Sequence, residues 1–201
     1  VDPPAVDLLA RTLIESDMNI TSVMRTLFNS DFFKEAFYKK VRSPAEVVAG
    51  TLRLTGDLHE PDPRWGDLPV TSTSMGQEIL EPPSVEGWHT GGEWINSGAF
   101  TSRVNFAADQ VSNADLTGVR DIISRIASSN GTAMSPQELV ERCLELMGPL
   151  KVSQETRDEL VQHAVPEGPL VWNTDDGYTA SAQRVTGMLA LIAGTREYQF
   201  G

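Results

Sequence analysis

Residues 76–107, GQEILEPPSVEGWHTGGEWINSGAFTSRVNFA, interrupt a sequence that is otherwise helical in character. The stretch contains a Pro-Pro pair, a Gly-Gly pair and two tryptophans. Prolines end helices and glycines permit tight turns, so this composition predicts a fixed, non-helical loop over residues 81–95. The rest of the fold is expected to be arranged around that loop.

On both sides of the loop, apolar residues recur every three or four positions, which is the spacing of one helix face. Ser43-Pro44-Ala45-Glu46 and Ser135-Pro136-Gln137-Glu138 each match a capping box with proline in the first helical position. The first of these helices is expected to stop at Gly56 and the second at Gly148. Further helices are expected around residues 6–13, 20–28, 32–37, 116–126 and 185–192.

No convincing alternation of apolar and polar residues indicates a strand. The sequence therefore predicts an all-α fold, an irregular bundle of short helices with a long Pro/Gly/Trp loop and little or no sheet. We expect one helical domain over residues 1–201. Two other segments, 56–73 and 165–179, are rich in proline, glycine and acidic residues and are expected to be surface loops.

The net charge of −12, from 28 acidic and 16 basic residues, disfavours nucleic-acid binding, because such a surface repels phosphate groups. No apolar run approaches the roughly 18 residues that a membrane-spanning helix needs. Cys143 is the single cysteine, which excludes an internal disulfide. Its position between Val140 and Leu144 is typical of an inert core thiol.

The loop and its flanks resemble the bacterial family called domain of unknown function 1800. The resemblance is carried by Gly76-Gln77, Pro82-Pro83, Val85, Gly87-Trp88, Gly91-Gly92, Trp94-Ile95-Asn96, Arg103 and Asn105-Phe106-Ala107. Ser43-Pro44-Ala45-Glu46, with Val47, Val48, Gly50 and Thr51, Ser30-Asp31-Phe32-Phe33 and the closing Ala193 to Gln199 extend it over most of the chain.

This resemblance implies the C-terminal portion of an exported bacterial protein, in an extracytoplasmic location. Because the family is named for its unknown function, the resemblance assigns no particular activity to the chain, and no cofactor is expected. The expected partners are the N-terminal part of the same protein and an envelope protein or glycan.

The loop has two interpretations as a site. In the first, the two indoles form a stacking face with polar groups at its edge, as sugar-binding sites do. The residues of this candidate binding site are Trp88, Gly91, Gly92, Trp94, Asn96, Arg103 and Asn105. In the second, the indoles plug a gap between helices, Asn96 or Ser97 caps the next helix, and Arg103 pairs with Glu78 or Glu93.

Catalytic and metal chemistry have weaker support. Asp57, His59, Glu60 and Asp62 crowd one segment, but their spacing matches no known calcium loop, so no metal site is expected. No motif for a catalytic serine, metalloprotease helix or phosphate loop is present, and no catalytic residue is assigned.

The leading hypothesis is a non-catalytic binding or assembly module of an exported protein. Its organising or contacting element is the loop over residues 81–95, which we call the Trp loop. The alternative is a carbohydrate-active hydrolase that uses Glu86, His89 and Glu93 beside the Trp loop.

Overall fold

A computed structural model of the chain describes residues 2–36, 39–58, 60–129, 133–148 and 150–200. The chain divides into two compact units, Val1–Lys40 and Val41–Gly201. Two units of this kind can belong to one folding domain, so the expected single domain over residues 1–201 stays a prediction.

The first unit contains α1 (Pro3–Glu15), α2 (Ile20–Asn29) and α3 (Asp31–Lys34). The side chains of Asn19 and Ser30 cap α2 and α3, and α1 packs against α2. Ala5 is the one buried residue among the described residues of this unit. Its exposed large apolar side chains are Val6, Leu8, Ile14, Met18, Ile20, Met24, Phe28 and Phe33. The third helix was expected over residues 32–37, but it ends at Lys34 with Glu35 as its C-cap. Phe37 itself lies outside the described residues.

The second unit holds the larger core. Its α-helices are α4 (Pro44–Thr55), α5 (Leu68–Ser74), α6 (Ser97–Ser112), α7 (Thr117–Ser129), α8 (Pro136–Leu146), α9 (Gln154–Ala164), α10 (Asp175–Ala193) and α11 (Arg196–Gln199). Short 3₁₀ helices are η1 (Pro63–Asp67), η2 (Gly91–Trp94) and η3 (Val165–Glu167). Strands β1 (Ala133–Met134) and β2 (Leu170–Val171) form one antiparallel pair, with Met134 opposite Leu170.

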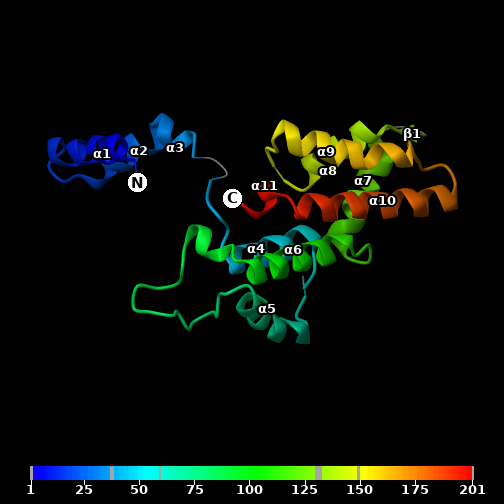
Figure 1. Ribbon diagram of the computed structural model, residues 1–201, viewed down its shortest axis with the longest axis horizontal. Coiled ribbons are helices and arrows are strands. Elements are labelled where there is room, and N and C mark those ends of the chain that lie inside the picture. The colour runs from blue at the N-terminus through cyan, green and yellow to red at the C-terminus, as the bar shows by residue number, and fades with distance from the viewer. Residues whose placement is uncertain (1, 37–38, 59, 130–132, 149, 201) are drawn as a thin grey trace. The chain divides into compact units, whose positions relative to one another are not determined.

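Helix α10 lies between two helix pairs in this unit (Figure 1). It packs against α6, which in turn packs against α4, and on its other side it contacts α8 and α9. The main apolar cluster draws on α6 to α10 and includes Cys143, which is fully buried, so burial raises the pKa of its thiol. The all-α prediction is confirmed. No described helix is long and apolar enough to cross a membrane.

A smaller apolar cluster lies where α4 meets α5. Val48, Leu52 and Met75 form its buried part, and Leu58, Leu68 and Phe106 pack against it. Val48, Leu52, Leu58 and Leu68 of this cluster also line the pocket described below.

The ends of α4 are fixed by local sequence. The Ser43 hydroxyl accepts from the Glu46 amide and the Glu46 carboxylate accepts from the Ser43 amide, so the predicted capping box is confirmed. Gly56 ends the helix with a φ of 68°, a conformation that favours glycine. Gly118 lets α7 approach α4 closely, because a Cβ there would meet the backbone of Leu54 and Thr55.

The expected loop over 56–73 is wrong in its second half, where η1 and α5 lie. Proline was interpreted as a loop residue, but Pro63 and Pro69 occupy first-turn positions, where a missing N–H costs nothing. The Asp62 carboxylate caps η1 by accepting from the Arg64 amide.

The expected loop over 165–179 is also too long. Residues 165–167 form η3, 170–171 form β2, and α10 begins at Asp175. The Thr174 hydroxyl caps α10 by accepting from the Gly177 amide. Asp175 and Asp176, acidic residues of the expected loop, instead occupy the first helical turn, where acidic side chains are favourable.

Candidate functional site

The two tryptophans of the loop have different environments. Trp94 is 4% exposed, as the plug interpretation requires. Trp88 is half-buried, and its indole N–H donates to the Glu78 carbonyl at 3.0 Å. The burial of Trp94 and the hydrogen bond of Trp88 both give the indoles a structural role. A role of the two indoles in contacting a ligand stays a prediction. Gly91 has a φ of 59° at the start of η2, which explains the need for glycine there.

The proposed alternative catalytic residues lie at the surface. The Nδ1 atom of His89 lies 2.7 Å from the Glu93 carboxylate, and the His89 ring packs edge-on against Trp94. Glu86 is exposed, and its amide donates to the Ser84 hydroxyl. Neither Glu86 nor Glu93 lines the pocket described below.

The three polar residues of the candidate binding site that follow the loop, Asn96, Arg103 and Asn105, have different environments along α6. The Asn96 side chain caps this helix by accepting from the Ala99 amide, which confirms that expectation. Asn105 is exposed, whereas Arg103 is fully buried. The guanidinium of Arg103 donates to the side chain and the carbonyl of Gln199 at 3.1 and 3.3 Å. The expected pairing of Arg103 with Glu78 or Glu93 is therefore wrong.

Burial shapes the electrostatics of Arg103. Loss of water lowers the pKa of its guanidinium, the nearby Arg42 lowers it further, and Glu46 opposes both effects. Its Nη1 atom has no hydrogen-bond partner among the described residues. Arg103 thus ties α6 to the C-terminal residues of the chain, which is a structural contact.

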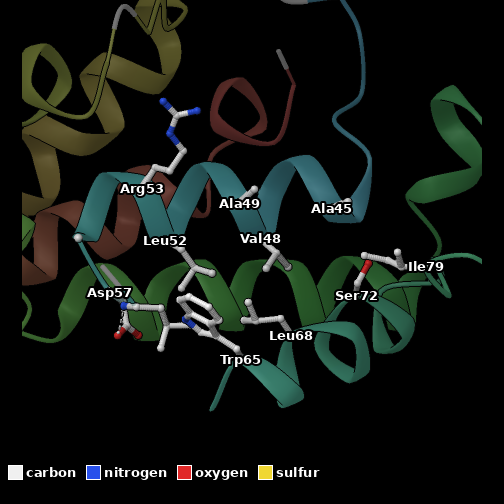
Figure 2. A pocket seen from close by; sticks show the side chains of 12 residues that line it. Ala45, Val48, Ala49, Leu52, Arg53, Asp57, Trp65, Leu68, Ser72 and Ile79 are labelled. Atoms are coloured by element: carbon white, nitrogen blue, oxygen red, sulfur yellow. Dashed lines mark hydrogen bonds between the residues drawn. The ribbon is translucent and has the colours of Figure 1, made fainter. Parts of the chain in front are cut away.

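The structure contains an apolar pocket of about 750 Å³ between α4 and α5 that sequence reasoning did not predict (Figure 2). We call it the α4–α5 pocket. Its lining residues are Ala45, Val48, Ala49, Leu52, Arg53, Gly56, Asp57, Leu58, Trp65, Leu68, Ser72 and Ile79. Val48 and Leu52 point from α4 toward Leu68 and Trp65 on the opposite wall.

The walls of this pocket are aliphatic and aromatic, but they are not closed. Trp65 is 47% exposed and Ile79 is 40% exposed. Arg53 points away from Trp65 in Figure 2, so its charge is directed away from that wall. The arrangement is that of a preformed concave site for an apolar group.

One end of the pocket is built on Asp57. Its carboxylate accepts from Arg64 at 3.0 and 3.2 Å, from the Leu58 amide at 2.8 Å and from Gln110 at 3.3 Å. Burial opposes ionisation of Asp57, but these hydrogen bonds outweigh it and lower the pKa of the carboxyl. Arg64 also pairs with Asp62, so one guanidinium is shared between two carboxylates.

The opposite end is built on residues 77–79, just before the Trp loop. The Gln77 side chain accepts from the Ala45 amide at 2.9 Å, and the Gln77 amide donates to the Ser72 carbonyl at 3.0 Å. These bonds tie α4, α5 and the segment before the loop together beside Ile79.

The acidic segment considered for a metal ion does not gather ligands. Within the described part of the chain, no group of three or more histidine, cysteine or acidic residues could hold a metal. Asp57 and Asp62 instead bind Arg64. His59 lies outside the described residues.

Comparison with known proteins places the chain in a family. A family model described as "Protein of unknown function (DUF1800)" matches residues 1–200. The chain belongs to this family. No curated protein and no solved structure matches it. Because the DUF1800 description gives no activity, a function for this member has to be argued from its geometry.

Proposed function

We propose that this DUF1800 protein is a non-catalytic binding module that holds a small apolar ligand in the α4–α5 pocket. The observation that carries the proposal is the pocket itself, about 750 Å³ in volume with aliphatic and aromatic walls. Ligand sites generally have volumes of roughly 300–1,000 Å³ and apolar walls with few polar groups.

The driving force for such binding is burial of exposed apolar surface. Trp65 and Ile79 leave much of their side chains in contact with water, and a ligand between them and α4 would remove that surface from solvent. Each square ångström of apolar surface buried contributes about 25 cal/mol. A ligand that covers the Trp65 ring and the Ile79 side chain therefore gains affinity from burial alone.

In this proposal the Trp loop organises the pocket. The buried Trp94 anchors the loop, and the Trp88 indole donates to the Glu78 carbonyl just before it. In the same short segment, Gln77 bonds to α4 and α5. Ile79, which lines the pocket, lies two residues after Gln77. The loop thus positions one end of the pocket through backbone contacts.

The setting of this activity is also a proposal. The family resemblance supports an exported bacterial protein that acts at the cell envelope, with the N-terminal part of the same protein or an envelope component as partners. The hydrolase alternative has no specific observation in its favour, because Glu86 and Glu93 are exposed and do not line the pocket.

The test is a titration of the intact chain with N-phenyl-1-naphthylamine, an uncharged dye whose emission rises in apolar surroundings. We expect saturable binding that Val48→Phe weakens at least tenfold, because Val48 lines the pocket and points from α4 toward its opposite wall. Gly50→Phe is the matched control, since Gly50 is exposed, does not line the pocket and has open space around it. Equal binding by both variants, or no binding by the unaltered chain, would refute the proposal.

A further inference from the structure

Building on the proposed function, we infer the ligand class of the α4–α5 pocket: an elongated, uncharged apolar molecule whose terminal hydroxyl pairs with Ser72. The inference rests on an unpartnered hydroxyl inside the pocket, on the charge of the surrounding segment and on the shape of the pocket.

Ser72 differs from the other hydroxyl residues of α5. Thr71, Thr73 and Ser74 are each bonded to a backbone carbonyl three or four residues earlier, at 3.1, 2.9 and 2.7 Å. A serine or threonine in a helix commonly satisfies its hydroxyl in this way. Ser72 is 1% exposed, yet its Oγ atom has no hydrogen-bond partner among the described residues. The buried hydroxyl is therefore the one left without a bond.

The Ser72 hydroxyl points toward Ile79 on the side of α5 that faces α4 (Figure 2). A buried hydroxyl without a partner is unfavourable, because it has lost its hydrogen bonds to water. A ligand that presents a hydroxyl beside Ser72 restores that bond, since each hydroxyl can donate or accept. The apolar walls at Val48 and Leu68 would hold the rest of the ligand.

The charge of the pocket's surroundings selects an uncharged end group. Residues 57–81 contain Asp57, Glu60, Asp62, Asp67, Glu78 and Glu81, against Arg64 and His59 as the basic residues. Arg64 already pairs with Asp57 and Asp62. Arg53 lies toward the Asp57 end and points away from Trp65, so it does not reach the Ser72 end. A ligand carboxylate beside Ser72 would therefore lose water without gaining a cation, and acidic neighbours would repel it. A ligand ammonium would also lose water in the apolar pocket. The carboxylate that lines the pocket, Asp57, is already paired with Arg64 and would not replace that water.

The lining residues give the pocket its shape. They extend along α4 from Ala45 to Gly56, a span of about 16 Å at a rise of 1.5 Å per residue. Asp57 lies near one end and Ser72 near the other in Figure 2. A linear aliphatic alcohol fits this arrangement, with its chain along α4 and its hydroxyl at the Ser72 end.

The experiment measures displacement of bound N-phenyl-1-naphthylamine from the intact chain by 1-dodecanol and by dodecanoate, at neutral pH and below the concentrations at which either aggregates. We expect dodecanol to displace the dye at a concentration at least tenfold lower than dodecanoate. Ser72→Ala should raise the dodecanol concentration required about fivefold, the effect of one hydrogen bond, and leave dodecanoate unchanged. Ser74→Ala is the matched control, because that hydroxyl is exposed, already bonded and outside the pocket.

The outcomes separate this inference from the proposed function. If the dye binds and Val48→Phe blocks it, but dodecanoate competes as well as dodecanol, the ligand class is wrong and the binding function stands. The same conclusion follows if Ser72→Ala and Ser74→Ala act alike on dodecanol, or if an amphipathic peptide of leucine and lysine displaces the dye while dodecanol does not. If the dye does not bind the unaltered chain, the proposed function and the ligand class fail together.

Discussion

Replacing Gly118 with alanine tests the contact that fixes the C-terminal end of α4, the helix that forms one wall of the pocket. A Cβ at this position would lie 2.7 Å from the Thr55 carbonyl carbon and 2.8 Å from its oxygen, and closer still to the Leu54 carbonyl oxygen. All three are backbone atoms, so the clash can be relieved only if α7 moves away from α4.

Overpacking of this kind typically costs about 1–3 kcal/mol, and the rigid backbone neighbours place Gly118→Ala in the upper half of that range. The gain from replacing glycine by alanine is at most about 1 kcal/mol in a helix interior and smaller at a first turn. We therefore expect a net loss of about 2 kcal/mol, which corresponds to a fall of about 4–8 °C in Tm for a chain of this length.

The assay is thermal and urea unfolding followed by far-ultraviolet circular dichroism. Gly50→Ala is the control, because Gly50 lies within α4 and a Cβ there would meet nothing within 4 Å. That variant should gain about 0.5–1 kcal/mol. If Gly118→Ala proved as stable as the unaltered chain, the close packing of α7 on α4 would be refuted.

Three further substitutions or treatments test other parts of the structure. Arg103→Ala should destabilise the chain by about 2–4 kcal/mol in urea titration, because it leaves a cavity and removes the donor to the buried Gln199 side-chain oxygen; a loss near zero would contradict the buried contact. The pKa of Asp57 is lowered in the folded chain, so its contribution is present above the unfolded pKa and is lost as the pH falls through the folded pKa. Asp57→Asn should therefore flatten the stability curve between neutral and acidic pH by about 1 kcal/mol, since Arg64 is largely exposed; an unchanged slope would disprove this. Cys143 should resist a thiol reagent in the native chain and react fully in denaturant, because it is buried and its pKa is raised; rapid reaction of the native chain would place it outside the core.

Helices whose limits are set by neighbouring residues could be predicted from sequence. The capping boxes at Ser43 and Ser135 start α4 and α8, and Gly56 ends α4 through its left-handed conformation. Asn96 starts α6 because its side chain accepts from the Ala99 amide three residues later. Each of these signals acts over three or four residues, so the surrounding sequence contains all the information required.

Proline and aspartate misled the prediction where one residue type serves two purposes. Pro63 and Pro69 are compatible with a loop, but also with the first turn of a helix. Aspartate is common in turns, but it is also favourable in the first turn of a helix, where Asp175 and Asp176 lie. Choosing between these alternatives depends on packing that no short window of sequence contains.

The candidate pocket could not be predicted because its residues meet only in three dimensions. Trp65 lies in an acidic, proline-rich segment with no apolar period, and only folding places it opposite Leu52. The buried contact between Arg103 and Gln199 joins residues 96 positions apart. Sequence reasoning paired Arg103 with nearby acids, since only those lay within reach of a local argument.

Methyl-resolved nuclear magnetic resonance of the intact chain during titration with 1-dodecanol tests the central claim most directly. We predict shifts in the methyl signals of Val48, Leu52 and Leu68, which line the α4–α5 pocket, with Leu139 and Met188 in the main core unchanged. Shifts centred on Leu139 and Met188, or no shifts at saturating alcohol, would contradict the assignment of this pocket as the ligand site.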